Sequence, residues 1–276
     1  MQAILGIDAA WTPGEPSGVA LVGRTAGSWR VACVAPSYEQ FLSACRGRAV
    51  DWAQRPRGSA PDVAGLVDAA KRRVSGNVTV VAVDMPIAKV PFESRRIADN
   101  EVSRAFGGLG CSAHSPNARR PGPFGANIMR QLSDAGFLLA TTGSDVGFAG
   151  CTIEVYPHPA LLSLLHRTYR VPYKVSRSGR YWRGASRAER IASLVREFRT
   201  ISVALSGVFG DLGFAIPEPH EVPTLSYLKR YEDALDGLVC AWVGLCFLRG
   251  EARPLGDESA AVWVPSGSLA VVSNRR

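Results

Sequence analysis

Two apolar runs of the chain each end in an aspartate, Ala3-Ile4-Leu5-Gly6-Ile7-Asp8 and Val78-Thr79-Val80-Val81-Ala82-Val83-Asp84. Each run is apolar almost throughout, which is typical of an interior strand that is buried on both faces of a sheet. A carboxylate there must stop at the sheet edge, find a partner or bind a cation, because burying it unpaired is costly. Two acids at one edge suit a magnesium-dependent phosphoryl-transfer site, so Asp8 and Asp84 are candidate catalytic metal ligands. The alternative for each is a turn residue that caps the next loop.

The residues between these runs predict a sheet with both antiparallel and parallel strands. Strands are expected at 17–22 and 29–34, and the short turns before them indicate antiparallel hairpins. Helical patterns at 38–46 and 62–74 follow, and a crossover of this kind usually places the next strand parallel in the sheet. The predicted fold class is therefore α/β, with three antiparallel strands followed by parallel ones and flanking helices.

The rest of the chain is predicted to be mainly helical. Residues 105–127 are rich in glycine and proline and are expected to form a loop. Helices are predicted at 128–135, 159–168, 187–203 and 224–248 (the longest), a short strand at 152–156, and a closing hairpin of 261–264 with 269–272. The simplest organisation is one domain over residues 1–276, with loop-rich and basic helical insertions at about 100–150 and 165–222.

Composition narrows the class of protein. Hydrophobic residues make up 46% of the 276 residues, which argues against global disorder. The net charge of +8 favours anionic partners, nucleic acid or nucleotides ahead of membranes, although arginine-rich chains also arise from base composition alone. The six cysteines include no C-x-x-C pair and there are only four histidines, which disfavours structural zinc. The N-terminus enters a strand directly, so a cytoplasmic location without a membrane partner is expected.

A second pair of acids, Asp233 and Asp236, lies at the start of the last predicted helix. The two are three residues apart and share one helix face. Residues 238–243 are apolar all round, so the helix should be buried with its acidic start near a sheet edge. Both aspartates are candidate catalytic metal ligands. The alternatives are acids that favour the positive end of the helix dipole, or that pair with Lys229 and Arg230.

Glu154, in the predicted strand 152–156, is a further candidate catalytic acid. Residues alternate there so that Glu154 and Tyr156 share one face of the strand. The alternative is a strand residue that faces solvent.

A basic stretch supplies candidate phosphate contacts. Residues 167–190 contain eight basic side chains, opposed only by Glu189 and interleaved with aromatic residues. Basic groups neutralise phosphates and aromatic rings stack on bases, so this pattern predicts a nucleic-acid footprint; the alternative is a solvated, flexible loop. A second basic pair, at 95–96, is followed by acids that offer local ion pairing. The candidate substrate-binding residues are Trp11, Arg95, Arg96, Lys174, Arg187 and Arg190.

Two histidines are weaker candidates. His114 lies in the expected loop, and His158 lies between two prolines. Either could move a proton near neutral pH. The alternative for both is a surface histidine.

Taken together, five motifs resemble the domain of unknown function 429 family, described as predicted nucleases with a ribonuclease H-like fold. The motifs are Gly6-Ile7-Asp8-x-x-Trp11, Val83-Asp84-Met85-Pro86, Arg96-x-Ala98-Asp99, Glu154-Val155-Tyr156-Pro157 and Asp233-Ala234-Leu235-Asp236-Gly237-Leu238-Val239-Cys240-Ala241. The resemblance spans roughly residues 2–265 and implies a mixed sheet flanked by helices. It also implies that Asp8, Asp84 and the pair Asp233 and Asp236 occupy the positions of metal-binding acids in ribonuclease H-like nucleases, such as Holliday-junction resolvases.

The expected function is a nuclease that uses Mg²⁺ or Mn²⁺ to hydrolyse phosphodiester bonds of DNA or RNA by a two-metal mechanism. One alternative is an ATP-handling phosphotransferase of the related actin-like fold, which also begins with Gly-Ile-Asp and a glycine-containing turn, here at 12–18. Another is a nucleic-acid-binding protein without catalysis. The oligomeric state stays open, with a homodimer through the C-terminal hairpin as one option.

Overall fold

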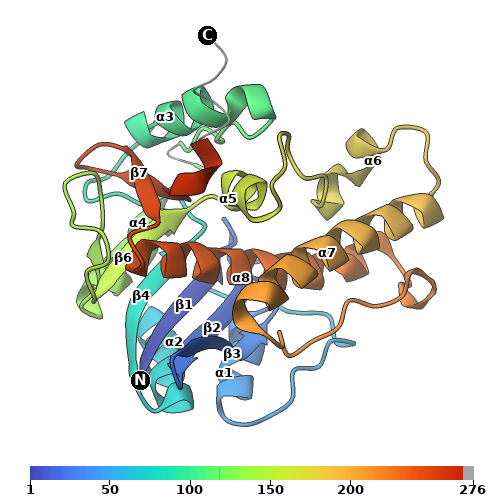
Figure 1. Cartoon of the computed structure of the whole chain (residues 1–276), viewed down its shortest axis with the longest axis horizontal. Helices are drawn as coiled ribbons and strands as arrows, with labels where there is room; N and C mark the ends of the chain where they lie inside the picture. Colours follow the sequence, from blue (N-terminus) through green and yellow to red (C-terminus); the bar gives the residue numbers. More distant parts are fainter. Residues whose placement is uncertain (118, 270–276) are drawn as a thin grey trace.

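The computed structural model describes residues 1–117 and 119–269 and contains one eight-stranded sheet. Its strand order is β3-β2-β1-β4-β6-β8-β7, with β5 beside β6 (Figure 1). Strand β1 (Gln2–Asp8) pairs antiparallel with β2 (Gly18–Thr25), which pairs antiparallel with β3 (Ser28–Ala35). The three predicted hairpin strands are thereby confirmed.

The remaining strands are mostly parallel. Strand β4 (Asn77–Val83) lies parallel to β1 on one side and to β6 (Cys151–Val155) on the other. Strand β6 is parallel to β8 (Ala261–Pro265) and to the short β5 (Leu138–Leu139). The mixed sheet, with antiparallel strands first and parallel strands after the crossover, confirms the predicted fold class and is consistent with a ribonuclease H-like arrangement.

Helices cover both faces of the sheet, because alternate residues of the central strands point in opposite directions. Leu5 and Ile7 of β1 pack with α1 (Tyr38–Cys45), α2 (Val63–Val74) and α4 (Pro123–Asp134). On the other face, Ile4 packs with α8 (Lys229–Leu248), which crosses β1 and β2 (Figure 1). Both faces of β1 are therefore buried, as its apolar sequence predicts.

Close approach between α8 and the sheet depends on two glycines. A Cβ atom on Gly6 would lie 2.2 Å from the carbonyl oxygen of Gly237, and one on Gly18 would lie 1.8 Å from that of Asp233. Any side chain at these positions would push the helix away from the sheet. The contact holds the acidic start of α8 beside the end of β1.

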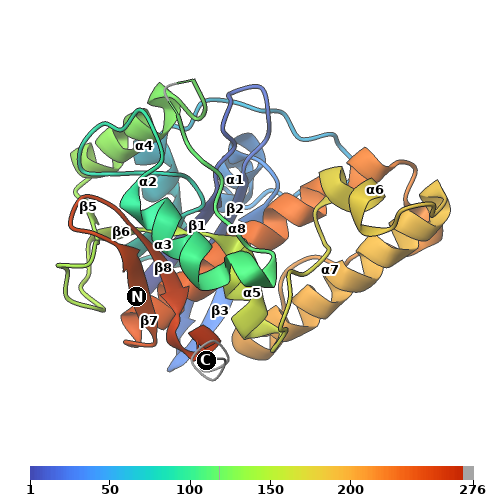
Figure 2. The same ribbon diagram turned by 90° about the horizontal axis from the view of Figure 1, so that it is seen from above.

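The other helices build outward from this core. Helix α5 (Pro157–Leu164) and the short α6 (Ser178–Tyr181) lead into α7 (Arg187–Phe209), which lies beside α8 (Figure 2). Helix α3 (Ile97–Phe106) packs against β7 (Ala252–Gly256) and β8. Short 3-10 turns occur at Gly107–Leu109, Val175–Arg177, Pro219–Glu221, Leu225–Leu228 and Ser266–Leu269.

Several predicted boundaries are wrong for identifiable reasons. The expected loop 105–127 contains the start of α4, because a proline at the first helical position, here Pro123, lacks only an N–H that would be unpaired anyway. Helix α7, with 23 residues, is longer than α8, with 20. Strand β8 pairs antiparallel with the preceding β7. Pro254 conceals β7 in the sequence, yet a proline is tolerated because β7 is an edge strand. Leu269 lies in a 3-10 turn, and 270–272 lie outside the described residues.

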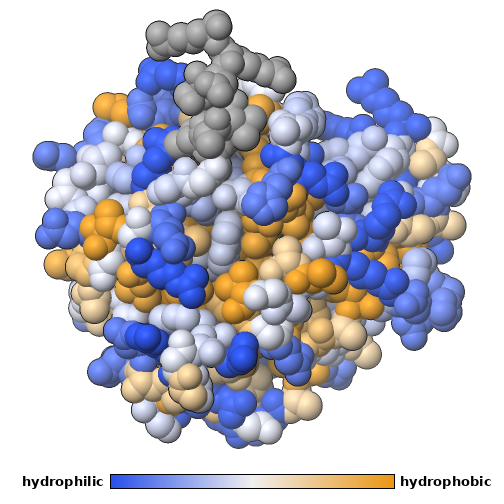
Figure 3. Space-filling view, viewed as in Figure 1, coloured by the Kyte–Doolittle hydropathy of each residue, from blue (hydrophilic) through white to orange (hydrophobic). Residues whose placement is uncertain are grey.

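The outer surface mixes residue types. Hydrophilic and apolar side chains are interspersed over the face seen in Figure 3. Within residues 1–117 and 119–269, no helix combines the length and the apolar character needed to cross a bilayer.

Candidate functional site

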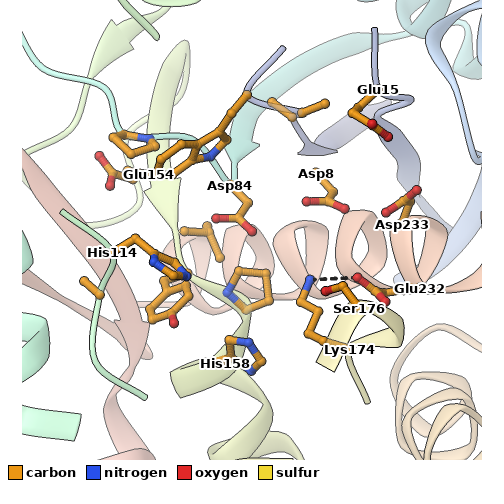
Figure 4. A pocket seen from close by; sticks show the side chains of 18 of the residues that line it. Asp8, Glu15, Asp84, His114, Glu154, His158, Lys174, Ser176, Glu232 and Asp233 are labelled. Carbon is orange, nitrogen blue, oxygen red and sulfur yellow. Dashed lines mark ion pairs between the residues drawn. The ribbon is translucent and has the colours of Figure 1, made fainter. Parts of the chain in front are cut away.

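Asp8 and Asp84 emerge side by side at one edge of the sheet. The neighbouring residues Ile7 and Val83 pair in the parallel ladder, and the Asp84 N–H donates to the carbonyl oxygen of Ile7 at 2.8 Å. Both side chains are half-buried and line the same cavity (Figure 4). The structure thus brings these two candidate ligands together, because adjacent parallel strands end at one edge.

Helix α8 adds Asp233 to this edge. Asp233 is 1% exposed, and its Oδ1 contacts the ammonium group of Lys229 one helical turn earlier. Its Oδ2 is buried with no hydrogen-bond partner among the described residues. A buried carboxylate oxygen without a donor is costly, so this atom is available to a cation that enters the cavity.

Asp236, predicted to complete the metal shell with Asp233 as support or alternate, is instead engaged inside the protein. The Tyr173 hydroxyl donates to its Oδ1 at 2.6 Å, and the Lys174 ammonium contacts its Oδ2. Asp236 therefore holds the segment that carries Tyr173 and Lys174 against α8. The sequence alone could not reveal this pairing, because the partners lie more than 60 residues away.

Glu232, which the sequence analysis did not select, completes this network. Its Oε2 accepts from the Val175 N–H at 2.6 Å, and its Oε1 lies 3.0 Å from the Lys229 ammonium and 3.4 Å from that of Lys174. Spacing was the available signal, since residues 232 and 236 are four apart and share a helix face.

Electrostatics separate these acids into two groups. Burial raises the pKa of Asp84 and of Asp233 well above the usual range, and the nearby Asp8 carboxylate raises both further. Burial would also raise the pKa of Glu232, but Lys229 and Lys174 outweigh it and lower that pKa. The pKa of Asp236 is raised to about 6, chiefly by burial. The edge formed by Asp8, Asp84 and Asp233 is therefore short of positive charge.

The cavity in front of this edge has a volume of about 700 Å³. Figure 4 shows Asp8 and Asp84 on one side, with Lys174 and His158 across from them. The same lining also includes basic and imidazole groups, and Trp11 lies near His114; these residues are Trp11, His114, Arg120, His158, Arg170, Lys174 and Arg177. Acidic and basic side chains thus line one space.

Comparison with known families matches residues 6–261 to a family model described as Protein of unknown function (DUF429). The chain belongs to this family. The match confirms the family indicated by the five sequence motifs, and its description states no activity. Neither the curated proteins nor the solved structures yield a match to this chain.

Glu154 in this DUF429 protein has a partner that the sequence did not reveal. It is buried, so the solvent-facing alternative is wrong. Its two oxygens lie 2.6 and 2.7 Å from the guanidinium of Arg96, and Oε2 also accepts from the Ile87 N–H at 3.0 Å. Arg96 in turn binds Asp99 at 2.8 Å. Arg96 is buried in this cluster, so its predicted contact with substrate is wrong.

Only some of the other predicted substrate-binding residues lie at the cavity. Trp11 and Lys174 line the cavity. The guanidinium of Arg95 is bound to Asn100, Ser103 and Ser115 and to backbone carbonyl groups. Arg187 and Arg190, in the first turn of α7, do not line the cavity.

The two histidines and the basic stretch can be placed in the structure. His158 is 3% exposed and is therefore not a surface histidine, whereas His114 is exposed at the cavity rim. The basic stretch 167–190 includes a 3-10 turn, α6 and the first turn of α7.

The acidic edge can be tested against the needs of a divalent cation. Among the described residues, no group of three or more His, Cys, Asp or Glu side chains already has the arrangement of a metal site. Mg²⁺, however, retains several waters and is usually held by only one or two carboxylates together with substrate oxygens. Asp8, Asp84 and the unpartnered Oδ2 of Asp233 supply hard oxygen donors of this kind. The donor set therefore fits Mg²⁺ or Mn²⁺.

Proposed function

We propose that this DUF429 protein is a metal-dependent phosphodiester hydrolase, a nuclease that acts on DNA or RNA. The observation that carries the proposal is the excess of carboxylate at the cavity edge. Asp8, Asp84 and Asp233 border one cavity, and Asp233 Oδ2 is buried without a donor within the described chain. Such an edge is stabilised by a cation and is poorly explained as a structural cluster.

In this proposal Asp8, Asp84 and Asp233 hold Mg²⁺ or Mn²⁺. The bound ion would supply an activated water and would neutralise charge on the reacting phosphate. Asp233, through its Oδ2, would be a ligand in place of Asp236, because both oxygens of Asp236 are engaged. Asp236 is then a positioning residue for Lys174.

Lys174 contributes a fixed positive charge beside the acids. Burial would lower its pKa, but Asp236, Tyr173 and Glu232 outweigh burial and raise the pKa well above its usual range. The side chain therefore stays an ammonium ion. It is already paired with Asp236 and Glu232, and a remaining N–H could donate to a phosphate oxygen in the cavity. The net charge of +8 would attract a polyanionic substrate.

The decisive experiment incubates the purified protein with labelled single-stranded, duplex and branched DNA and RNA. Mg²⁺ or Mn²⁺ is added in one series and a chelator in the other. Cleavage is expected only with metal, and it should be lost in Asp8→Asn but kept in Asp68→Asn, which neutralises an exposed acid on α2. The proposal fails if no substrate is cut, or if Asp8→Asn cuts as well as the unmodified protein.

A parallel measurement separates the alternatives. Isothermal calorimetry with Mn²⁺ is expected to show binding that Asp8→Asn weakens. Nucleic-acid binding without metal binding would instead favour a non-catalytic protein. Thermal stabilisation by ATP with Mg²⁺ would favour the phosphotransferase.

A further inference from the structure

Part of the cavity lining gathers positive charge without acidic partners. Arg120, Arg170 and Arg177 all line the cavity. Among the described residues, none of these three guanidinium groups forms an ion pair with a carboxylate. We call these arginines, with His114 and His158, the arginine wall. Like charges gathered in a cavity repel one another unless an anion binds between them.

The contacts within the arginine wall leave donors unused. Arg170 donates to the Gly110 carbonyl oxygen at 3.1 Å and contacts Nε2 of His158. The Nε atom of Arg170 and the Nδ1 atom of His158 are buried with no hydrogen-bond partner within the described chain. Arg177 reaches only Nε2 of His114, at 3.4 Å. Unused buried polar atoms at a cavity can be satisfied by a bound ligand or by ordered water.

The two histidines report the same excess of positive charge. Burial lowers the pKa of His158 well below its usual range, and Lys174, Arg170 and Arg177 lower it further. The pKa of His114 is lowered by burial and then by Arg177, Arg170 and Arg120. Both imidazoles are therefore neutral near pH 7, when each ring offers one N–H donor to an anion.

We propose that the arginine wall is a subsite for a terminal phosphate, and that the substrate is a nucleic-acid strand with a phosphorylated end. This inference rests on the proposed function, because it assigns the phosphodiester to the acidic side of the same cavity. A phosphate monoester carries a charge of about −1.5 to −2 and three acceptor oxygens, more than one diester offers. Three guanidinium groups match that charge better than they match an internal phosphate.

The size of the cavity agrees with a strand end. A volume of about 700 Å³ is in the range of pockets that enclose one small ligand. A strand end can enter such a space, whereas a continuous duplex would have to lie across it. Trp11 lines the same cavity and offers an aromatic face for the terminal base.

The test measures binding without cleavage, in a chelator and at one fixed ionic strength. Fluorescence anisotropy compares short single strands with a 5′-phosphate, a 3′-phosphate or no terminal phosphate. One phosphorylated end is expected to bind at least about tenfold more tightly than the unphosphorylated strand. At equal molar concentration, a mononucleotide should displace the labelled strand less effectively than the unlabelled phosphorylated strand does.

Matched variants locate the effect. The double variant Arg170→Gln with Arg177→Gln is expected to remove the preference for a phosphorylated end. Arg180→Gln with Arg183→Gln makes the same charge change at two exposed residues of the same stretch and should keep it. Replacing Arg170 also removes its hydrogen bond to the Gly110 carbonyl oxygen, which is a structural change. The single variant Arg177→Gln avoids this change, and it should weaken the preference for a phosphorylated end by itself.

The outcomes distinguish the subsite from the reaction. Equal binding of all three strands, or an equal loss in the Arg180 and Arg183 variant, overturns the subsite even if the protein cleaves nucleic acid. Equal competition by a mononucleotide overturns the assignment to a strand end. A preference that depends on Arg170 and Arg177, without cleavage under any metal condition, supports the subsite and overturns the nuclease.

Discussion

Two groups of carboxylates border the same cavity, and their charges are balanced in opposite ways. Glu154 and Asp99 share the buried guanidinium of Arg96, with contacts of 2.6 to 2.8 Å. Asp8 and Asp84 face the cavity beside a buried Asp233 whose Oδ2 lacks a donor in the described chain. Both groups include acids from parallel strand ends. Whether a buried acid is structural or available to a ligand therefore depends on its partner and not on its place in the sheet.

The largest expected loss of stability comes from breaking the ion-paired group of Glu154, Asp99 and Arg96, which we call the balanced group. Glu154→Gln leaves the Arg96 guanidinium buried beside Asp99 alone, and removing one partner of a buried ion pair typically costs about 3–5 kcal/mol. An arginine side chain does not lose its proton in a protein, so the guanidinium cannot escape by becoming neutral. Urea unfolding followed by circular dichroism measures the loss. A loss below about 1 kcal/mol would contradict a structural role for this pair.

Asp8, Asp84 and Asp233, which we call the unbalanced group, should instead make the stability of the fold depend on metal. At a Mn²⁺ concentration of about 100 times its Kd, binding stabilises the folded state by about 2.7 kcal/mol. Asp84→Asn is expected to remove most of that stabilisation, whereas Asp68→Asn should retain it. Differential scanning fluorimetry with and without Mn²⁺ provides the measurement. Equal gains in both variants would show that the ion binds away from this edge.

The sequence predicts which acids reach the sheet edge, but it does not predict their ion-pair partners when these are far away in the sequence. Apolar periodicity and the crossover place Asp8 and Asp84 on adjacent parallel strands, because local pattern and chain topology determine strand order. The partner of Glu154 is 58 residues away, and the partner of Asp236 is 62 residues away, in an insertion. No local pattern predicts such pairing. The sequence therefore identifies acids that reach the sheet edge but cannot tell which of them are neutralised.

The structure-forming glycines follow the same rule. The sequence places Gly6 in the first strand and in the motif that contains Asp8, but the requirement for a glycine comes from the backbone of α8, 2.2 Å from where its Cβ would lie. That contact joins residues more than 200 positions apart in the sequence. Strand and helix types were predictable, whereas the packing that brings Asp233 to the cavity required the structure.

Without metal, the unbalanced group should weaken the fold as pH rises. The pKa of Asp84 is raised in the folded state, so its contribution to stability is present below the unfolded value of about 3.9 and is lost as pH rises through the folded pKa. An asparagine cannot ionise. Asp84→Asn is therefore expected to raise the metal-free unfolding free energy at pH 8 by about 1–3 kcal/mol, with no gain near pH 3.5. Urea unfolding at both pH values in a chelator measures the difference. The prediction fails if the variant is less stable than the unmodified protein at pH 8.

An exposed pair supplies the smallest effect and the sharpest control for Glu154. Glu101 lies 2.6 Å from the guanidinium of Arg104, the same distance as the closer contact between Glu154 and Arg96. The Arg104 side chain is 76% exposed, whereas that of Arg96 is 5% exposed. Glu101→Gln is therefore expected to change the unfolding free energy by no more than about 0.5 kcal/mol, because water solvates the arginine that remains. The substitution and the contact distance match those of Glu154→Gln, so urea unfolding compares a buried network with an exposed single contact. Similar losses of unfolding free energy in both variants would mean that the effect of Glu154→Gln comes from losing the ion pair itself. The cost of a buried unpaired charge would then not distinguish the two groups of acids.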